Sequence, residues 1–222
     1  MTTAVFVQAR MGSTRLPGKA LLELAGRPVI AHVLTALLEI PADMHVLLCD
    51  SQSEEAFTDI AASHGFILFA GHPTDVLRRY CDAIRQFQPD TVIRATGDNP
   101  LVSSTAARMI LAKHIRANAD YTRFSGLPTG SGVEVAQSRA LLEAEMSSDD
   151  PYDREHVTPF IYRNPDRFSV TIVPAPARLT GSITVTLDTS ADYQFLSRLF
   201  DRLYDGAPIP IERIIQDGIA NG

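Results

Sequence analysis

Cysteine is scarce in this sequence, and the shortage narrows the kinds of site that the protein can build. Only two of its 222 residues are cysteines, Cys49 and Cys81, and their separation excludes a CxxC metal motif. A disulfide framework is also excluded, and we expect two reduced, mostly buried thiols in a cytoplasmic protein. We see neither a signal peptide nor an apolar run approaching the ~18 residues that a membrane span needs, so no membrane segment is expected.

An excess of positive charge is missing as well. Twenty Lys and Arg residues face 26 Asp and Glu residues, which gives a formal net charge of −6. This balance argues against a general binder of nucleic acid or of anionic membranes, although basic residues can still cluster around one small anion. The 45% hydrophobic and 21% charged residues are typical of a globular protein. The length indicates one or two domains and favours one if the fold is α/β.

The first two-thirds of the chain alternates between strand patterns and helix patterns. Short runs rich in β-branched or apolar residues predict strands at 4–8, 45–49, 66–70 and 91–95. Helical spacing predicts helices at about 29–38, 53–64, 75–87 and 104–117. Strands separated by helices of this length indicate βαβ units, whose right-handed crossovers place helices on both faces of a parallel sheet.

The last third is less regular, although it still mixes the two kinds of element. We expect strands at 121–124, 133–136, 168–173 and 183–186, with a glycine-rich loop at 126–132. We expect helices at about 138–146, 153–162, 191–204 and 211–219. No repeat or long linker divides the chain, so the pattern predicts one mixed α/β domain.

The strongest local signal is the loop after the first strand, QARMGSTRLPGK at residues 8–19. It carries three cations, Arg10, Arg15 and Lys19, and its glycines, Gly12 among them, allow the backbone to approach an anion closely. Ligands of open α/β sheets bind at the carboxyl ends of the strands, where this loop lies. We interpret it as a phosphate-binding loop without the GxxxxGK[ST] spacing of a P-loop; a solvated loop with scattered charges is the alternative.

Two aspartates follow later strands. Asp98 lies in TGDNP, after the fourth predicted strand, and Asp188 lies in LDT, after a strand near the end of the chain. Each is equally well explained as a cap of the following turn or helix. A carboxylate at a strand end also suits a hard cation such as Mg²⁺, and the two would share one ion if their strands are neighbours.

These motifs together resemble those of a known family. The loop QARMGSTRLPGK with the following LLELAGRPVIAHV is similar to the nucleotide-binding signature of the cytidylyltransferases that make CMP-sugars. With GHPTDVLRRY, TGDNP, DREHVTPFIYRNP and LDTSADY, the chain resembles the spore-coat polysaccharide biosynthesis protein F subfamily and, more distantly, CMP-Kdo synthetase. The resemblance covers about residues 5–199.

The resemblance implies both a fold and an activity. The fold is a glycosyltransferase-A-like three-layer α/β sandwich with a mixed, mostly parallel sheet. A Rossmann-like nucleotide-binding half spans about residues 1–118, and an acceptor-binding half spans about 119–222. The activity is Mg²⁺-dependent transfer of CMP from CTP to a sugar or sugar acid, with release of pyrophosphate, for surface polysaccharide. A homodimer is implied by the resemblance alone. The alternatives are another nucleotide, a non-sugar acceptor, or a nucleotide-binding partner protein that has lost catalysis.

The resemblance also assigns roles to residues on the nucleotide side. Positions that hold the nucleotide and its phosphates match Gln8, Arg10, Gly12, Ser13, Arg15 and Lys19. Asp75 and Arg79 match residues on the base or ribose side, and Arg79 is adjacent to Arg78, so one of the two at most faces the ligand. Asp98 and Asp188 match the metal-binding pair and, with Arg15 and Lys19, make up the expected catalytic set.

The acceptor side departs from the family pattern. The resemblance places acceptor contacts at Arg154, Glu155 and His156, and Glu134 follows the glycine-rich loop, where it is a candidate for the same site. A solvated Glu134 and a structural His156 are the alternatives. Many relatives carry an acidic residue in a pattern like P-D-G-x-(D/E)-V-E, whereas residues 128–134 here read PTGSGVE. The missing acid leaves the identity of the acceptor open.

Overall fold

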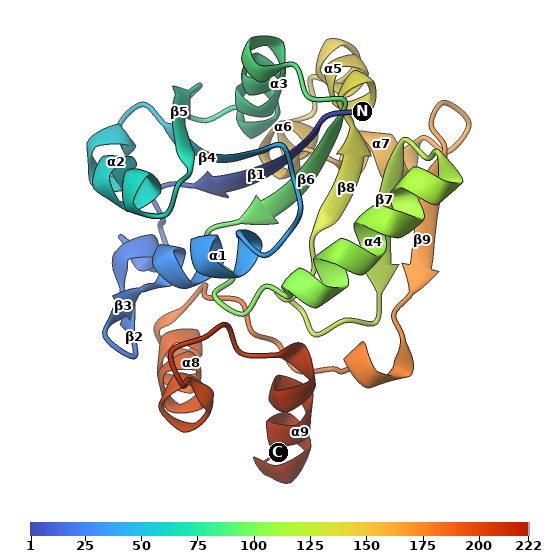
Figure 1. The fold of residues 1–222 in the computed structure, drawn as a ribbon. Helices are drawn as coiled ribbons and strands as arrows, with labels where there is room; N and C mark the ends of the chain where they lie inside the picture. Colours follow the sequence, from blue (N-terminus) through green and yellow to red (C-terminus); the bar gives the residue numbers. More distant parts are fainter. Residues whose placement is uncertain (222) are drawn as a thin grey trace.

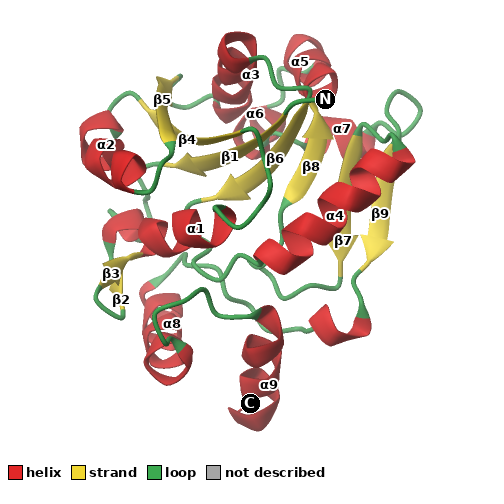
Figure 2. Ribbon diagram, viewed as in Figure 1, coloured by secondary structure: helices red, strands yellow, loops and turns green. Residues whose placement is uncertain are grey.

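A seven-stranded sheet forms the centre of the computed structural model, which describes residues 1–221 (Figures 1 and 2). Its strand order is β5-β4-β1-β6-β8-β7-β9. The strands are β1 (Thr3–Ala9), β4 (Met44–Asp50), β5 (Ile67–Gly71), β6 (Thr91–Thr96), β7 (Tyr121–Ser125), β8 (Glu134–Gln137) and β9 (Val170–Pro174). Within this sheet β8 alone runs antiparallel to its neighbours, so the expected mixed, mostly parallel sheet is confirmed.

Helices cover both faces of the sheet because alternate residues of the central strands are apolar on both sides. Val5 and Val7 of β1 pack on one face, and Ala4 and Phe6 pack on the other. The first face is covered by α1 (Val29–Leu37), α2 (Glu54–Ser63) and α4 (Ser104–Ala117). The second face is covered by α3 (Val76–Phe87), α5 (Ser138–Ser147) and α7 (Pro159–Arg163), and α6 (Pro151–His156) packs against α3 and α7. The three layers agree with the expected sandwich.

A smaller apolar cluster lies near the carboxyl ends of β1 and β6. It joins α8 (Ser190–Leu203) and α9 (Ile211–Asn221) to the β2–β3 hairpin (Glu23–Leu24 and Arg27–Pro28). Val185 and Leu187 are fully buried in this cluster, which fixes the segment that carries Asp188. None of the described helices is both long and apolar enough to cross a bilayer. The thiols of Cys49 and Cys81 are free and buried, as expected.

Two predicted elements differ from the structure. The helix expected at 153–162 is two short helices, α6 and α7, separated by Val157, whose φ is +73° and ψ −53°. The amide of Thr158 donates to the carbonyl of His156 at 2.9 Å, which completes a γ-turn of the strained type. The strand expected at 183–186 is only an isolated bridge between Thr129 and Thr184, because this segment packs on the C-terminal cluster rather than joining the sheet.

Candidate active site

A cleft of about 490 Å³ opens where β1 and β6 end, a size typical of small-molecule sites. Ten of the residues predicted for the site line it: Gln8, Arg10, Ser13, Arg15, Lys19, Arg79, Asp98, Glu155, His156 and Asp188. Gly12, Asp75, Glu134 and Arg154 are not among the described residues that line it. The cleft therefore brings together the phosphate-loop cations, Asp98 and Asp188, and part of the expected acceptor segment.

Buried polar atoms without a partner also gather at this cleft. Among the described residues, Gln8 Oε1, Arg94 Nε and Asn99 Oδ1 are buried and have no hydrogen-bond partner, and all three residues line the cleft. Most buried polar groups of native proteins are hydrogen-bonded, and an exception at a cleft is typical of a site that a ligand completes. The cleft is thus lined by polar residues whose hydrogen-bonding capacity is not fully used within the protein.

The loop after β1 is held in place by its own backbone. The carbonyl of Met11 accepts from the amides of Ser13 and Gly18, both at 3.1 Å, and the amide of Met11 donates to Ser53 Oγ at 2.9 Å. Gly18 has a φ of +67°, a left-handed conformation that glycine adopts without strain. A short 3₁₀ helix, Lys19–Leu21, follows directly and directs Lys19 into the cleft.

Lys19 lies between the two aspartates. Its Nζ donates to Asp98 Oδ2 at 2.7 Å, to Asp188 Oδ1 at 2.8 Å and to the carbonyl of Leu187 at 2.8 Å. The amide of Leu187 donates to the carbonyl of Asp98 at 3.1 Å, so the segment after β6 and the segment before α8, which carry the two carboxylates, are directly joined. Burial alone would lower the pKa of Lys19, but the two carboxylates together raise it above its ordinary value. Lys19 is therefore charged at neutral pH.

The same oxygen atoms fit a divalent cation. Two carboxylates and a carbonyl converge on one cationic atom, and such oxygens are the ligands of hard metal ions. No cluster of three or more His, Cys, Asp or Glu side chains suited to a metal occurs among the described residues. That is compatible with Mg²⁺, which typically binds one or two carboxylates together with substrate phosphates. Arg15 also reaches Asp188, at 3.1 Å, but its side chain is 65% exposed.

On the predicted base or ribose side, Arg79 rather than Arg78 faces inward. Arg79 is 1% exposed and donates to the carbonyls of His72 and Pro73 at 2.6–3.1 Å. Burial lowers the pKa of its guanidinium, and the charge of Asp50 partly offsets this effect. Arg78 is 57% exposed and pairs with Asp82 on the outer face of α3.

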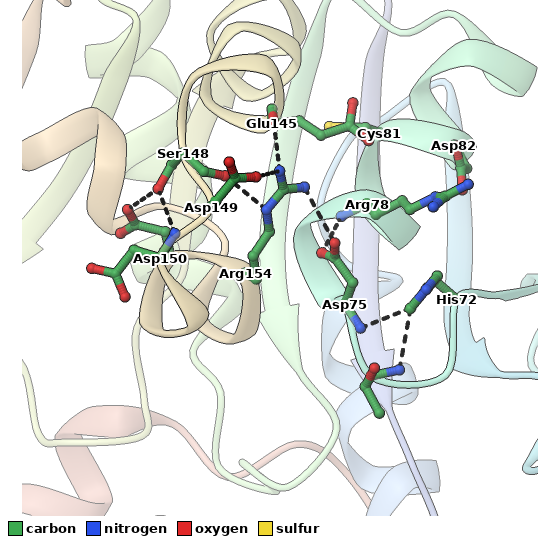
Figure 3. A network of polar contacts seen from close by, with 12 residues as sticks. His72, Asp75, Arg78, Cys81, Asp82, Glu145, Ser148, Asp149, Asp150 and Arg154 are labelled. Carbon is green, nitrogen blue, oxygen red and sulfur yellow. Dashed lines mark hydrogen bonds and ion pairs between the residues drawn. The ribbon is translucent and has the colours of Figure 1, made fainter.

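Arg154 and Asp75 belong to a polar network beside the cleft (Figure 3). Asp75 caps α3 by accepting from the amide of Arg78 at 2.9 Å, and it accepts from Arg154 Nη1 at 3.2 Å. Arg154 also donates to the carbonyls of Ser148 and Glu145, both at 2.8 Å. These contacts hold α6 against α3 and the end of α5. Arg154 thereby supports the segment whose next residues, Glu155 and His156, line the cleft.

Glu134 lies behind the cleft, and the residue in front of it is Arg94. Arg94 Nη1 donates to Glu134 Oε2 at 2.5 Å. Tyr121 Oη and Thr158 Oγ1 both donate to Glu134 Oε1, the latter at 2.9 Å. Arg94 lines the cleft, with 14% of its side chain exposed. Arg94 is not among the residues expected from the motifs. A charged residue inside the apolar strand sequence TVIRAT is nevertheless a signal, since an unpaired buried Arg is rare.

Comparison with known proteins shows close likeness over nearly the whole chain. A family model described as "Cytidylyltransferase" matches residues 4–207. The spore coat polysaccharide biosynthesis protein SpsF of Bacillus subtilis (strain 168) is 30% identical over 219 residues, which cover 94% of this chain and 90% of the relative.

Solved structures share the fold. A cytidylyltransferase of Leptospira borgpetersenii serovar Hardjo-bovis (strain JB197) has a TM-score of 0.89 at 24% identity, covering 99% of this chain and 96% of that one. CMP:2-keto-3-deoxy-manno-octonic acid synthetase complexed with CTP has a TM-score of 0.71 at 16% identity, covering 91% and 99%. These likenesses confirm the sandwich fold that the sequence motifs imply.

Proposed function

Since the chain belongs to the cytidylyltransferase family, we propose that it transfers CMP from CTP to a sugar or sugar acid and releases pyrophosphate. The observation that carries the proposal is the meeting of Lys19 with Asp98 and Asp188 at the carboxyl ends of the central strands. A lysine beside two carboxylates suits an anionic ligand that arrives with a divalent cation. The nucleotide would occupy the half formed by about residues 1–118, and the acceptor would contact the half formed by about 119–222.

The chemistry needs positioning and charge neutralisation more than covalent catalysis. An acceptor oxygen must approach the α-phosphorus in line with the departing pyrophosphate. We assign Gln8, Arg10, Ser13, Arg15 and Lys19 to the nucleotide and its phosphates, where Arg15 and Lys19 would stabilise the negative charge of the leaving group. Asp98 and Asp188 would hold Mg²⁺, which when bound neutralises phosphate charge.

We place the acceptor against Glu155, His156 and Arg94. Glu155 accepts from Arg10 at 3.4 Å across the cleft, an exposed contact that contributes little to stability and is easily exchanged for a ligand. Arg94 presents a buried Nε without a partner, while Glu134, Tyr121 and Thr158 fix its surroundings from behind. A guanidinium in this position favours an acceptor with a carboxylate or phosphate, and a sugar acid has the former.

Pyrophosphate release tests this proposal. The purified protein is incubated with CTP, Mg²⁺ and, separately, sugar acids, neutral sugars and sugar phosphates, and the CMP conjugate is identified by mass spectrometry. We expect release that depends on an anionic acceptor. CTP binding without release for any acceptor in the three classes would instead favour a nucleotide-binding partner protein that has lost catalysis.

Three further proposals concern the protein as a whole. The first two, a homodimer and a cytoplasmic location, remain expectations from the sequence. The third, a role in surface polysaccharide such as that of a spore coat, is supported by the likeness to SpsF. Light scattering on the purified protein measures the first directly, and a monomer at micromolar concentration contradicts it.

A further inference from the structure

Lys19 uses all three of its ammonium protons within the site. They go to Asp98 Oδ2, Asp188 Oδ1 and the carbonyl of Leu187, and the side chain is 12% exposed. An ammonium has three donors, so none remains for a phosphate oxygen. The proposed role of Lys19 on the triphosphate therefore requires at least one of these bonds to break.

A metal ion at the two carboxylates requires the same change. Asp98 and Asp188 would hold the ion through carboxylate oxygens, and Asp98 Oδ2 and Asp188 Oδ1 are the oxygens that now accept from the Lys19 ammonium, so the two cations would compete for the same atoms. The carboxylates would also be poorly compensated if Lys19 left alone, because Arg15 contacts only Asp188 and is largely exposed. The positive charge of an arriving divalent ion would thus replace the positive charge that the carboxylates lose when the ammonium leaves.

We propose that Lys19 and the divalent metal exchange places during the catalytic cycle. In the ligand-free protein, Lys19 holds Asp98 and Asp188 together. When the metal and the triphosphate bind, the metal takes the carboxylates and the ammonium moves to the phosphates. The inference rests on the proposed function for the nucleotide, and it makes Lys19 both a competitor of the metal and a ligand of the triphosphate.

Metal binding without nucleotide distinguishes this exchange from a simple phosphate-binding role. We would titrate Mn²⁺ into nucleotide-free protein and measure free Mn²⁺ by electron paramagnetic resonance. Lys19→Met removes the competing ammonium, and we expect Mn²⁺ to bind at least tenfold more tightly than to the wild type. Lys19→Gln, which keeps a hydrogen-bond donor without the charge, should give a gain in the same direction; circular dichroism verifies that each variant is folded.

Two matched variants separate exchange from general electrostatics. Arg15→Met removes one positive charge beside Asp188 but does not free the position between the carboxylates, and we expect less than a threefold gain. Lys113→Met removes the only other lysine of the chain, which is exposed on α4, and should leave Mn²⁺ affinity unchanged. Unchanged or weaker Mn²⁺ binding in the folded Lys19 variants, or an equal gain in Arg15→Met, would overturn the exchange.

A separate measurement distinguishes failure of the proposed function from failure of the exchange. CTP binding to the wild type in Mg²⁺ is measured separately by calorimetry. Absence of CTP binding would reject the nucleotide assignment, while the Mn²⁺ titrations would still decide whether Lys19 competes with a metal. If CTP binds and the Lys19 variants show no gain for Mn²⁺, the function stands and the exchange is rejected.

Discussion

The pair formed by Arg94 and Glu134 permits a quantitative test of the site's supporting structure. The two residues face each other in the β6–β8 register, 2.5 Å apart, with side chains 14% and 19% exposed. Arg94→Met leaves the Glu134 carboxylate with donors only from Tyr121 and Thr158. Removing one partner of a buried pair costs about 3–5 kcal/mol, and the two remaining bonds favour the lower end, about 3 kcal/mol.

A double-mutant cycle isolates the interaction itself. Glu134→Gln keeps the acceptor for Tyr121 and Thr158 while removing the charge, so the double variant should lose less than the sum of the two single variants. We expect a coupling free energy of about 2 kcal/mol, measured by urea denaturation at neutral pH. The exposed pair of Arg167 and Glu143, 2.8 Å apart, is the control and should couple by less than about 0.5 kcal/mol. Equal coupling for the two pairs would refute the reasoning.

Three other predictions follow from named contacts. Lys19→Ala should weaken CTP binding by about 1.5–3 kcal/mol while cytidine affinity changes less than about threefold, as calorimetry would measure; equal losses for both ligands contradict a phosphate role. Asp98→Asn and Asp188→Asn should each abolish most Mg²⁺-dependent turnover. The turnover of the double variant should be at most about tenfold lower than that of the less active single variant, whereas additive effects or turnover in the presence of a chelator argue against a shared ion. Burial lowers the pKa of His114 to about 4. Between pH 6.5 and about 4, His114 is therefore protonated in the unfolded state but neutral in the folded state. Stability should therefore fall by up to about 3 kcal/mol as the pH drops through this range, and His114→Gln should reduce that loss in urea titrations; an unchanged pH dependence excludes His114 as its source.

The physical basis of the His114 prediction is its hydrogen bonding. Nδ1 lies 3.0 Å from Thr122 Oγ1, and Nε2 lies 3.1 Å from the side-chain amide nitrogen, Nε2, of Gln137. Because that amide donates, Nε2 accepts and the ring is neutral with its proton on Nδ1. A second proton on Nε2 would face a donor inside the core.

The alternating elements could be predicted because their causes are local. The apolar periods of the central strands and of the helices between them are visible in the sequence, and their alternation indicates a parallel sheet. Two predictions are wrong, the strand at 183–186 and the continuous helix at 153–162, because the conformation of each segment depends on contacts with residues distant in the sequence. Residues 183–187 pack on α8, and Val157 is buried against the second face of the sheet.

Many residues of the site could be predicted from the sequence, but the contacts that join them could not. The cations of the first loop and the aspartates at two strand ends follow from motifs, yet the contact that joins the aspartates is a bond between Leu187 and Asp98, 89 residues apart. The position of Lys19 between them depends on the same contact. Glu134 and Arg154 were recognised as charged residues of the acceptor half, but cross-element partners, Arg94 and Asp75, determine where their side chains lie.

The most direct test of the central claim is a set of calorimetric titrations, in which the wild-type protein is titrated separately with CTP, UTP, GTP and ATP in the presence of Mg²⁺. It needs no knowledge of the acceptor. We expect CTP to bind most tightly and chelation of Mg²⁺ to weaken its binding. Equal affinity for all four nucleotides, or no binding of any, would contradict the assignment of this cleft to CTP.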